Sequence, residues 1–264
     1  MPRSRHPIRS RRPARLAAAA SACAALLVPV AACSAGGADD GGGSASLRVL
    51  AAASLTDVFE AAGAAYEEEH PDVEVEFSFA GSQELAAQVE QGIPADVLVT
   101  ADTATMESVA DHTGESAVIA RNALTIVTPP DDPGGVEGLA DLADPGLRLV
   151  LAAPEVPAGR YGRQVLDAAG VDAVPDSQEP NVRAVLSKVR LGEADAGLVY
   201  VTDAAAAGEA VRTVPVPAGQ NAVAAYPAAT LAGSGQPGAA ADFVGWLGAA
   251  EARGILADAG FLLP

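Results

Sequence analysis

The stretch Leu47-Arg-Val-Leu-Ala-Ala-Ala-Ser54-Leu-Thr-Asp57 decides the fold that we expect for this chain. Residues 47–52 form a short apolar run with the length of one buried strand. Apolar residues then recur at helical spacing until Pro71 stops the run. Ser54, with Asp57 three residues later, matches a capping box. The stretch therefore predicts a strand, a tight turn and a helix that is capped at its start by Ser54 and Asp57.

The same unit of strand, loop and helix repeats along the rest of the chain. Strands are predicted at 73–79, 96–100, 124–128, 147–152, 197–201 and 225–231, and helices at 82–91, 161–169, 182–191 and 239–259. Strands that alternate with helices predict parallel sheets, so the expected fold class is α/β with a doubly wound sheet. In such a sheet the loops that follow the strands meet at one edge, where ligands bind.

The start of the chain has the features of an exported protein. Six arginines precede an apolar run over residues 16–32, which is typical of a secretory signal peptide and short for a transmembrane span, the alternative reading. Val30-Ala-Ala-Cys33 resembles the lipobox of bacterial lipoproteins, in which the cysteine is lipidated. We therefore expect a signal peptide at 1–32, a flexible tether at 33–46, and a lipid anchor at Cys33 on the extracytoplasmic face of the cell membrane.

The charge balance excludes nucleic acid as a partner. The chain has 16 Lys and Arg against 34 Asp and Glu, a formal net charge of -18, and only ten basic residues remain after residue 32. Such a chain offers no basic surface that could displace counterions from phosphates. The two cysteines, Cys23 and Cys33, both precede the folded part, so a catalytic thiolate and a cysteine-based metal site are excluded there.

The sequence has few of the residues and motifs that enzymes use for catalysis. His70 and His112 lie among charged or turn residues, and no Gly-x-Ser-x-Gly elbow, Walker loop or His-Glu-x-x-His motif is present. No stretch has the spacing of a calcium loop. We therefore predict neither catalytic residues nor a cation site. A secreted hydrolase with Ser54 or Ser82 as nucleophile is the alternative from another functional class.

Several predicted helices begin with small or polar residues directly after a strand and its loop. These starts are Ser54, Gly81-Ser82, Pro157-Ala158 and Asn181-Val182. The first-turn amides of a helix have no internal partner and lie at the positive end of its dipole, so they bind anions. One serine at a helix start more often caps its own helix. Several such starts at one edge of a sheet predict an oxyanion site without cationic side chains.

Six segments resemble the periplasmic molybdate-binding proteins of ABC transporters, in order and spacing from about residue 47 to 261. They are Leu50-Ala-Ala-Ala-Ser54-Leu-Thr-Asp57, Phe79-Ala-Gly-Ser82, Gly92-Ile-Pro-Ala-Asp-Val97, Val156-Pro-Ala-Gly159, Asn181-Val-Arg-Ala184 and Gly197-Leu-Val-Tyr200. The resemblance implies that Ser54 and Ser82 donate from hydroxyl and amide to the oxyanion. It implies that Ala158 and Val182 donate from the amide alone, and that Tyr200 donates from its phenol.

The resemblance also implies a two-lobed periplasmic-binding-protein fold of type II, with the ligand cleft between its lobes. Lobe 1 would comprise 47–124 plus 228–264, and lobe 2 would comprise 125–227. The implied function is that of a monomeric extracytoplasmic receptor, without a cofactor, that captures molybdate or tungstate and delivers it to an ABC permease. Arg160 and Arg183 stand beside two implied donors, either as positive charge at the cleft mouth or as solvated helix-start residues.

A site made only of donors suits an oxyanion that is fully deprotonated. Phosphate near neutral pH keeps a proton that needs an acceptor, and Asp57 is the nearest carboxylate. Phosphate is therefore disfavoured. A receptor for sulfate or another small oxyanion remains the alternative, because the sequence gives the donors but no cavity radius.

Overall fold

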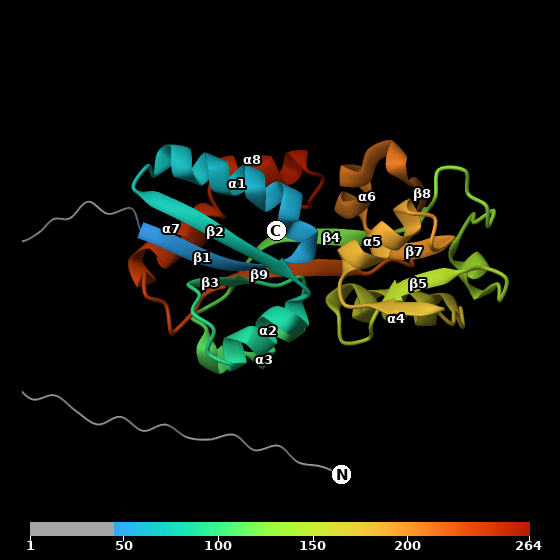
Figure 1. Cartoon of the computed structure of the whole chain (residues 1–264), viewed down its shortest axis with the longest axis horizontal. Helices are drawn as coiled ribbons and strands as arrows, with labels where there is room; N and C mark the ends of the chain where they lie inside the picture. Colours follow the sequence, from blue (N-terminus) through green and yellow to red (C-terminus); the bar gives the residue numbers. More distant parts are fainter. Residues whose placement is uncertain (1–44) are drawn as a thin grey trace, which may run out of the picture. The chain divides into compact units, whose positions relative to one another are not determined.

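The computed structural model describes residues 45–264 (Figure 1). The predicted signal peptide at 1–32, the Cys33 lipidation site and nearly all of the predicted tether lie outside the described residues. The strands are β1 Ala45–Ala52, β2 Val73–Ala80, β3 Val97–Val99, β4 Ala117–Thr128, β5 Leu149–Ala152, β6 Ser177–Glu179, β7 Ala196–Tyr200, β8 Arg212–Pro215 and β9 Val223–Thr230. The α-helices are α1 Thr56–Glu69, α2 Ser82–Glu90, α3 Thr103–Ser108, α4 Pro157–Ala169, α5 Val182–Arg190, α6 Val201–Ala207, α7 Pro237–Trp246 and α8 Ala250–Asp258.

The strands form one mixed sheet in the order β2-β1-β3-β9-β4-β7-β5-β6, with β8 paired to β4. β1 is parallel to β2 and β3, and β5 is parallel to β6 and β7. β4 and β9 instead run antiparallel to each of their neighbours. The predicted α/β class is confirmed, but the prediction of purely parallel sheets was wrong, because an apolar run marks a strand without giving its direction.

β4 and β9 run between two halves of this sheet (Figure 1). The first half holds β1, β2, β3, β9 and residues 117–123 of β4, with α1, α2, α3, α7 and α8 packed around them. The second half holds residues 124–128 of β4 with β5 to β8, together with α4, α5 and α6. The helix starts that the sequence singled out therefore belong to two separate parts of the sheet.

Long elements match the prediction better than short ones. Helices α1, α2, α4 and α5 lie near their predicted ranges, although α4 begins earlier, at Pro157, where proline suits the first helical position. The predicted helix at 239–259 is two helices, α7 and α8, separated by a turn that contains Gly248. The short elements α3, α6, β6 and β8 were not predicted, because a few residues carry no readable period.

An aromatic cluster fixes the helices of the first half against the sheet. The Tyr66 ring meets Phe243 and Trp246 edge to face, at centroid distances of 5.0 Å and 5.3 Å. The Phe59 and Phe77 rings lie 5.7 Å apart and join α1 to β2. Such aromatic pairs contribute about 0.5–1.5 kcal/mol beyond the burial of their area. The cluster thus holds α1 in place, and with it the turn that carries Ser54.

Among residues 45–264, no helix combines the length and the apolar character needed to cross a membrane.

Candidate functional site

A small cavity lies where the carboxyl ends of β1 and β2 meet the first turns of α4 and α5. Its volume is about 10 Å³, about the space that one water molecule needs. The residues that line it come from both halves of the sheet: Ala52, Ala53, Ser54, Ala80, Gly81, Ser82, Ala101, Val156, Pro157, Ala158, Asn181, Val182 and Tyr200. No side chain in this lining carries a charge.

All five predicted ligand residues line this one cavity. Ser54 lies in the 3-10 turn that follows β1, and Tyr200 is the last residue of β7. Ser82 and Val182 are the first residues of α2 and α5, and Ala158 is the second residue of α4. Amides at these helix positions have no partner inside their own helix. Three helix starts and two further hydroxyls therefore converge from segments that are far apart in the sequence.

Both serine hydroxyls are held by partners outside their own helices. Ser82 Oγ accepts a hydrogen bond from the Ala101 amide at 3.0 Å, so its hydroxyl hydrogen stays available to a ligand in the cavity. Ser54 Oγ lies 3.0 Å from the phenol oxygen of Tyr226, and both groups are buried. The tendency of a serine to cap its own helix does not apply at either position.

The predicted capping box of Ser54 and Asp57 was wrong. The 3-10 turn separates Ser54 from α1, which begins only at Thr56, and no side chain caps either element. The Asp57 carboxylate instead binds Arg183 of α5. This leaves the lining of the cavity without an acid, so a ligand that needs an acceptor finds none among the charged side chains.

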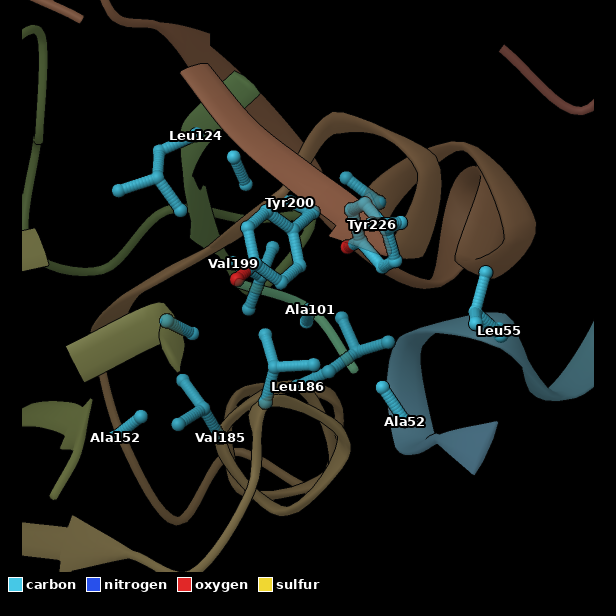
Figure 2. Close-up of a cluster of buried hydrophobic side chains, with 14 of the residues drawn as sticks. Ala52, Leu55, Ala101, Leu124, Ala152, Val185, Leu186, Val199, Tyr200 and Tyr226 are labelled. Atoms are coloured by element: carbon cyan, nitrogen blue, oxygen red, sulfur yellow. The ribbon is translucent and has the colours of Figure 1, made fainter. Parts of the chain in front are cut away.

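The Tyr200 phenol is a buried donor without a partner. Its oxygen is out of contact with solvent and forms no hydrogen bond within the part of the chain that the structure describes. Its ring lies beside that of Tyr226, with centroids 5.9 Å apart (Figure 2). Burial raises the pKa of the Tyr200 phenol well above its ordinary value. The group therefore stays protonated over the working pH range and can only be satisfied by an acceptor in the cavity.

Neither of the two expected roles of Arg160 and Arg183 is what the structure shows. Arg160 binds Asp102, and Arg183 binds Asp57 and the fully buried Asp203. Both guanidinium groups are therefore neutralised by carboxylates and lie outside the lining of the cavity. Burial raises the pKa of Asp203 to about 7, although the Arg183 Nε at 2.8 Å opposes this shift.

Among residues 45–264, no histidine that could serve as a base lines the cavity beside either serine. The His70 ring stacks against Tyr66 at 4.2 Å, and His112 lies in a 3-10 turn near Ile93, so neither histidine lines the cavity. Within residues 45–264, no cluster of three or more His, Cys, Asp or Glu side chains has the arrangement of a metal site. The chemistry that the cavity supports is hydrogen bonding to a small acceptor.

Two residues of the site were missed in the sequence. Ala101 follows β3 at the same edge of the sheet, so the rule used for the other loops could have found it. Tyr226 lies within β9, which runs antiparallel to β3 and β4, and no local pattern points to it. Its contact with Ser54 is a purely tertiary one.

Comparison with known proteins agrees with this geometry. The family model described as bacterial extracellular solute-binding protein matches residues 47–262. A protein of Mycobacterium tuberculosis named molybdate-binding protein ModA is 42% identical over 222 residues, which cover 83% of this chain and 85% of that protein. The family description and the relative's name both denote binding proteins.

Solved structures show the fold and leave the ligand open. The periplasmic molybdate-binding protein of Azotobacter vinelandii matches with a TM-score of 0.73 at 24% identity, over 83% of this chain and 99% of that one. The sulfate-binding protein SubI of Mycobacterium tuberculosis also matches with a TM-score of 0.73, at 20% identity, over 82% of this chain and 86% of that one. The predicted periplasmic-binding-protein fold is therefore confirmed. On the family match over nearly all of the described residues, the chain belongs to the bacterial extracellular solute-binding proteins.

Proposed function

We propose that this protein is an extracytoplasmic receptor that binds molybdate and hands it to an ABC permease. The observation that carries the proposal is the single cavity lined by Ser54, Ser82, Ala158, Val182 and Tyr200, in which the buried Tyr200 phenol has no hydrogen-bond partner among residues 45–264. The 42% identical relative is named for molybdate binding, which supports the choice of ligand.

The donor set favours an oxyanion without protons. The two serines offer hydroxyls and amides, Ala158 and Val182 offer amides, and Tyr200 offers a phenol that stays protonated. Hydrogen bonds to a charged partner contribute about 1.5–3 kcal/mol each, so such a set supports tight binding even after ordering and desolvation are subtracted. Hydrogen phosphate would find no carboxylate to accept its proton, because none of residues 45–264 that line the cavity is an acid.

Among fully deprotonated dianions, the choice depends on cavity size. Metal–oxygen bonds in molybdate and tungstate are longer than the sulfur–oxygen bonds of sulfate and nearly equal to each other. A cavity fitted to molybdate therefore also takes tungstate and holds sulfate loosely. Sulfate is the rival ligand, because a sulfate-binding protein shares the fold.

The position of the cavity between the two halves of the sheet suggests how binding is signalled. We assign lobe 1 to 47–124 plus 228–264 and lobe 2 to 125–227, with the chain crossing in β4 and again within β9. An anion that touches both lobes stabilises their closed arrangement, and a permease can recognise that arrangement. We further propose that residues 1–32 are a lipoprotein signal peptide and that lipid on Cys33 anchors a monomeric receptor outside the cell membrane.

Ligand binding can be tested by thermal unfolding with molybdate, tungstate, sulfate and phosphate. A ligand at about one hundred times its Kd adds about 2.7 kcal/mol, which raises the Tm of a domain of this size by roughly 5–10 °C. We expect this rise with molybdate and tungstate, and a smaller one or none with sulfate and phosphate. Stabilisation by sulfate without stabilisation by molybdate would overturn the choice of ligand.

The site itself can be tested with serine variants. Changing Ser54→Ala and Ser82→Ala together removes two donors to a charged ligand, so we expect the affinity for molybdate to fall at least tenfold. Ser187→Ala, on the exposed side of α5, is the matched control and should bind as the wild type does. Calorimetric titration measures both. Wild-type affinity in the double variant would place the binding site elsewhere.

A further inference from the structure

We infer that Arg160 and Arg183 are positioning residues that hold the two halves of the sheet together over the cavity. This inference rests on the proposed function. Arg160 lies two residues after Ala158 in the first turn of α4, and Arg183 directly follows Val182 at the start of α5. Each arginine thus shares a helical turn with an amide that faces the cavity. Each one pairs with an acid of the first half, which lies on the opposite side of the cavity.

Arg160 is bound to the start of α3 by several contacts. Its Nε donates to Asp102 Oδ2 at 2.8 Å, and its Nη2 donates to the same oxygen and to Thr105 Oγ1, the latter at 2.6 Å. The Asp102 side chain is 5% exposed, and its other oxygen caps α3 by accepting from the Thr105 amide at 2.9 Å. Asp102 also follows Ala101, which binds the Ser82 hydroxyl. This ion pair therefore joins the Ala158 side of the cavity to the Ser82 side.

Arg183 makes the corresponding link on the Ser54 side. Its Nη2 binds the carboxylate of Asp57, in the first turn of α1 just after the turn that carries Ser54. Its Nε lies 2.8 Å from Asp203 in α6, a fully buried residue of the second half. Asp203 anchors the arginine within its own half, while Asp57, which is 56% exposed, is the partner across the cavity.

The placement of these two pairs sets them apart from the other ion pairs. Seven ion pairs occur among residues 45–264, and the other five join residues within one half. The two that cross span 58 and 126 residues of sequence and both begin beside a proposed amide donor. A third crossing contact runs from Gln83 Nε2 to the carbonyl of Pro180 at 2.8 Å. Each of these three contacts thus joins residues within three positions of the cavity lining.

These contacts give the arginines a role without contact with the anion. Opening the halves about β4 and β9 would break both crossing pairs and separate Ser54 and Ser82 from Ala158 and Val182. The pairs and the anion therefore stabilise the same closed arrangement, and losing a pair lowers the population that binds. The cost should appear as faster release of the anion and should diminish with added salt.

The decisive variant is Asp57→Asn, because it removes one crossing pair and leaves the buried Asp203 paired with Arg183. Asp132→Asn is the matched control, since it makes the same change in the Arg212 pair, which lies within one half. In the full chain we expect Asp57→Asn to raise the molybdate Kd and its dissociation rate about twofold to fivefold in low salt. The difference should vanish between about 0.01 M and about 1 M NaCl, as the Debye length falls from about 30 Å to about 3 Å.

Conservative and combined variants complete the test. Asp57→Glu, which keeps the charge, should recover most of the wild-type affinity. The double variant Asp57→Asn and Arg160→Gln should release molybdate faster still, and it should show a larger radius of gyration than the wild type by solution X-ray scattering without ligand. Wild-type release rates in Asp57→Asn, or an equal effect of Asp132→Asn, would overturn the inference. A wild-type protein that does not bind molybdate, with a double variant that still expands, would refute the proposed function and leave the positioning role supported.

Discussion

The Tyr200→Phe variant offers a sharp test of the site, because two of its effects have opposite signs. In the structure the Tyr200 phenol is buried without a hydrogen-bond partner among the described residues. A buried, unpaired hydroxyl costs about 1–3 kcal/mol, so phenylalanine should stabilise the ligand-free protein by an amount of this order. For a domain of this size that is a rise in Tm of several degrees, at roughly 2–4 °C per kcal/mol.

The affinity of the same variant should fall. The phenol is proposed to donate to a dianion, and a hydrogen bond to a charged group contributes about 1.5–3 kcal/mol. Since about 1.4 kcal/mol is a factor of ten, the Kd for molybdate should rise about tenfold to a hundredfold. Calorimetric titration gives the Kd, and thermal unfolding followed by circular dichroism gives the stability without ligand.

Tyr226→Phe is the matched control for this experiment. Tyr226 is as deeply buried as Tyr200, but its phenol oxygen is paired with Ser54 Oγ at 3.0 Å. Its removal should lower the stability of the ligand-free protein by about 1 kcal/mol instead of raising it. The reasoning fails if Tyr200→Phe destabilises the ligand-free protein as Tyr226→Phe does and leaves the affinity for molybdate unchanged.

Three further predictions concern backbone approach, pH and the core. A Cβ at Gly81 would lie 2.5 Å from the Pro180 carbonyl oxygen, so Gly81→Ala should force the halves of the sheet apart and weaken molybdate binding. Gly138 has open space around it, so Gly138→Ala should keep the wild-type Kd for molybdate. Titration calorimetry measures the Kd of both variants. Folding raises the pKa of the Asp203 carboxyl from 3.8 to about 7, so between these pH values the folded protein holds a proton that the unfolded chain releases. The free energy of unfolding of the wild type should therefore fall relative to that of Asp203→Asn from about pH 4 to pH 7 and level off above. Urea unfolding measures both, and parallel pH profiles would refute this prediction. The Phe243 ring is fully buried among other aromatic rings, so Phe243→Ala should lower the free energy of unfolding by about 3–5 kcal/mol in urea, with no change in the Kd of the remaining folded protein.

Local sequence was sufficient for the elements that position the site. The run from Leu47 to Asp57 predicts a strand followed by a turn and a helix, and the structure has β1, a 3-10 turn and α1 there. Asn181 caps α5 through its bond to the Ala184 amide, as a helix-start residue should. Apolar periodicity and capping act over a few residues, so they can be read from one segment at a time.

The roles of individual side chains at the site depended on contacts that no segment contains. Ser82 binds Ala101 and Ser54 meets Tyr226, so neither serine caps its own helix, and this left the capping prediction for Ser54 wrong. Arg183, which had two possible roles in the sequence, is shared between carboxylates 126 positions before it and 20 positions after it along the chain.

By itself, the sequence determined the α/β class, the helix starts and the five residues that were expected to meet at one oxyanion site. Only the tertiary structure decided the antiparallel course of β4 and β9, the partners of the serine hydroxyls, and the pairing of Arg160 and Arg183 across the cavity. The physical reason is the range of the forces involved. Backbone propensity and capping are settled among near neighbours, whereas the partner of a buried hydroxyl or charge is whichever group the folded chain brings within about 3 Å.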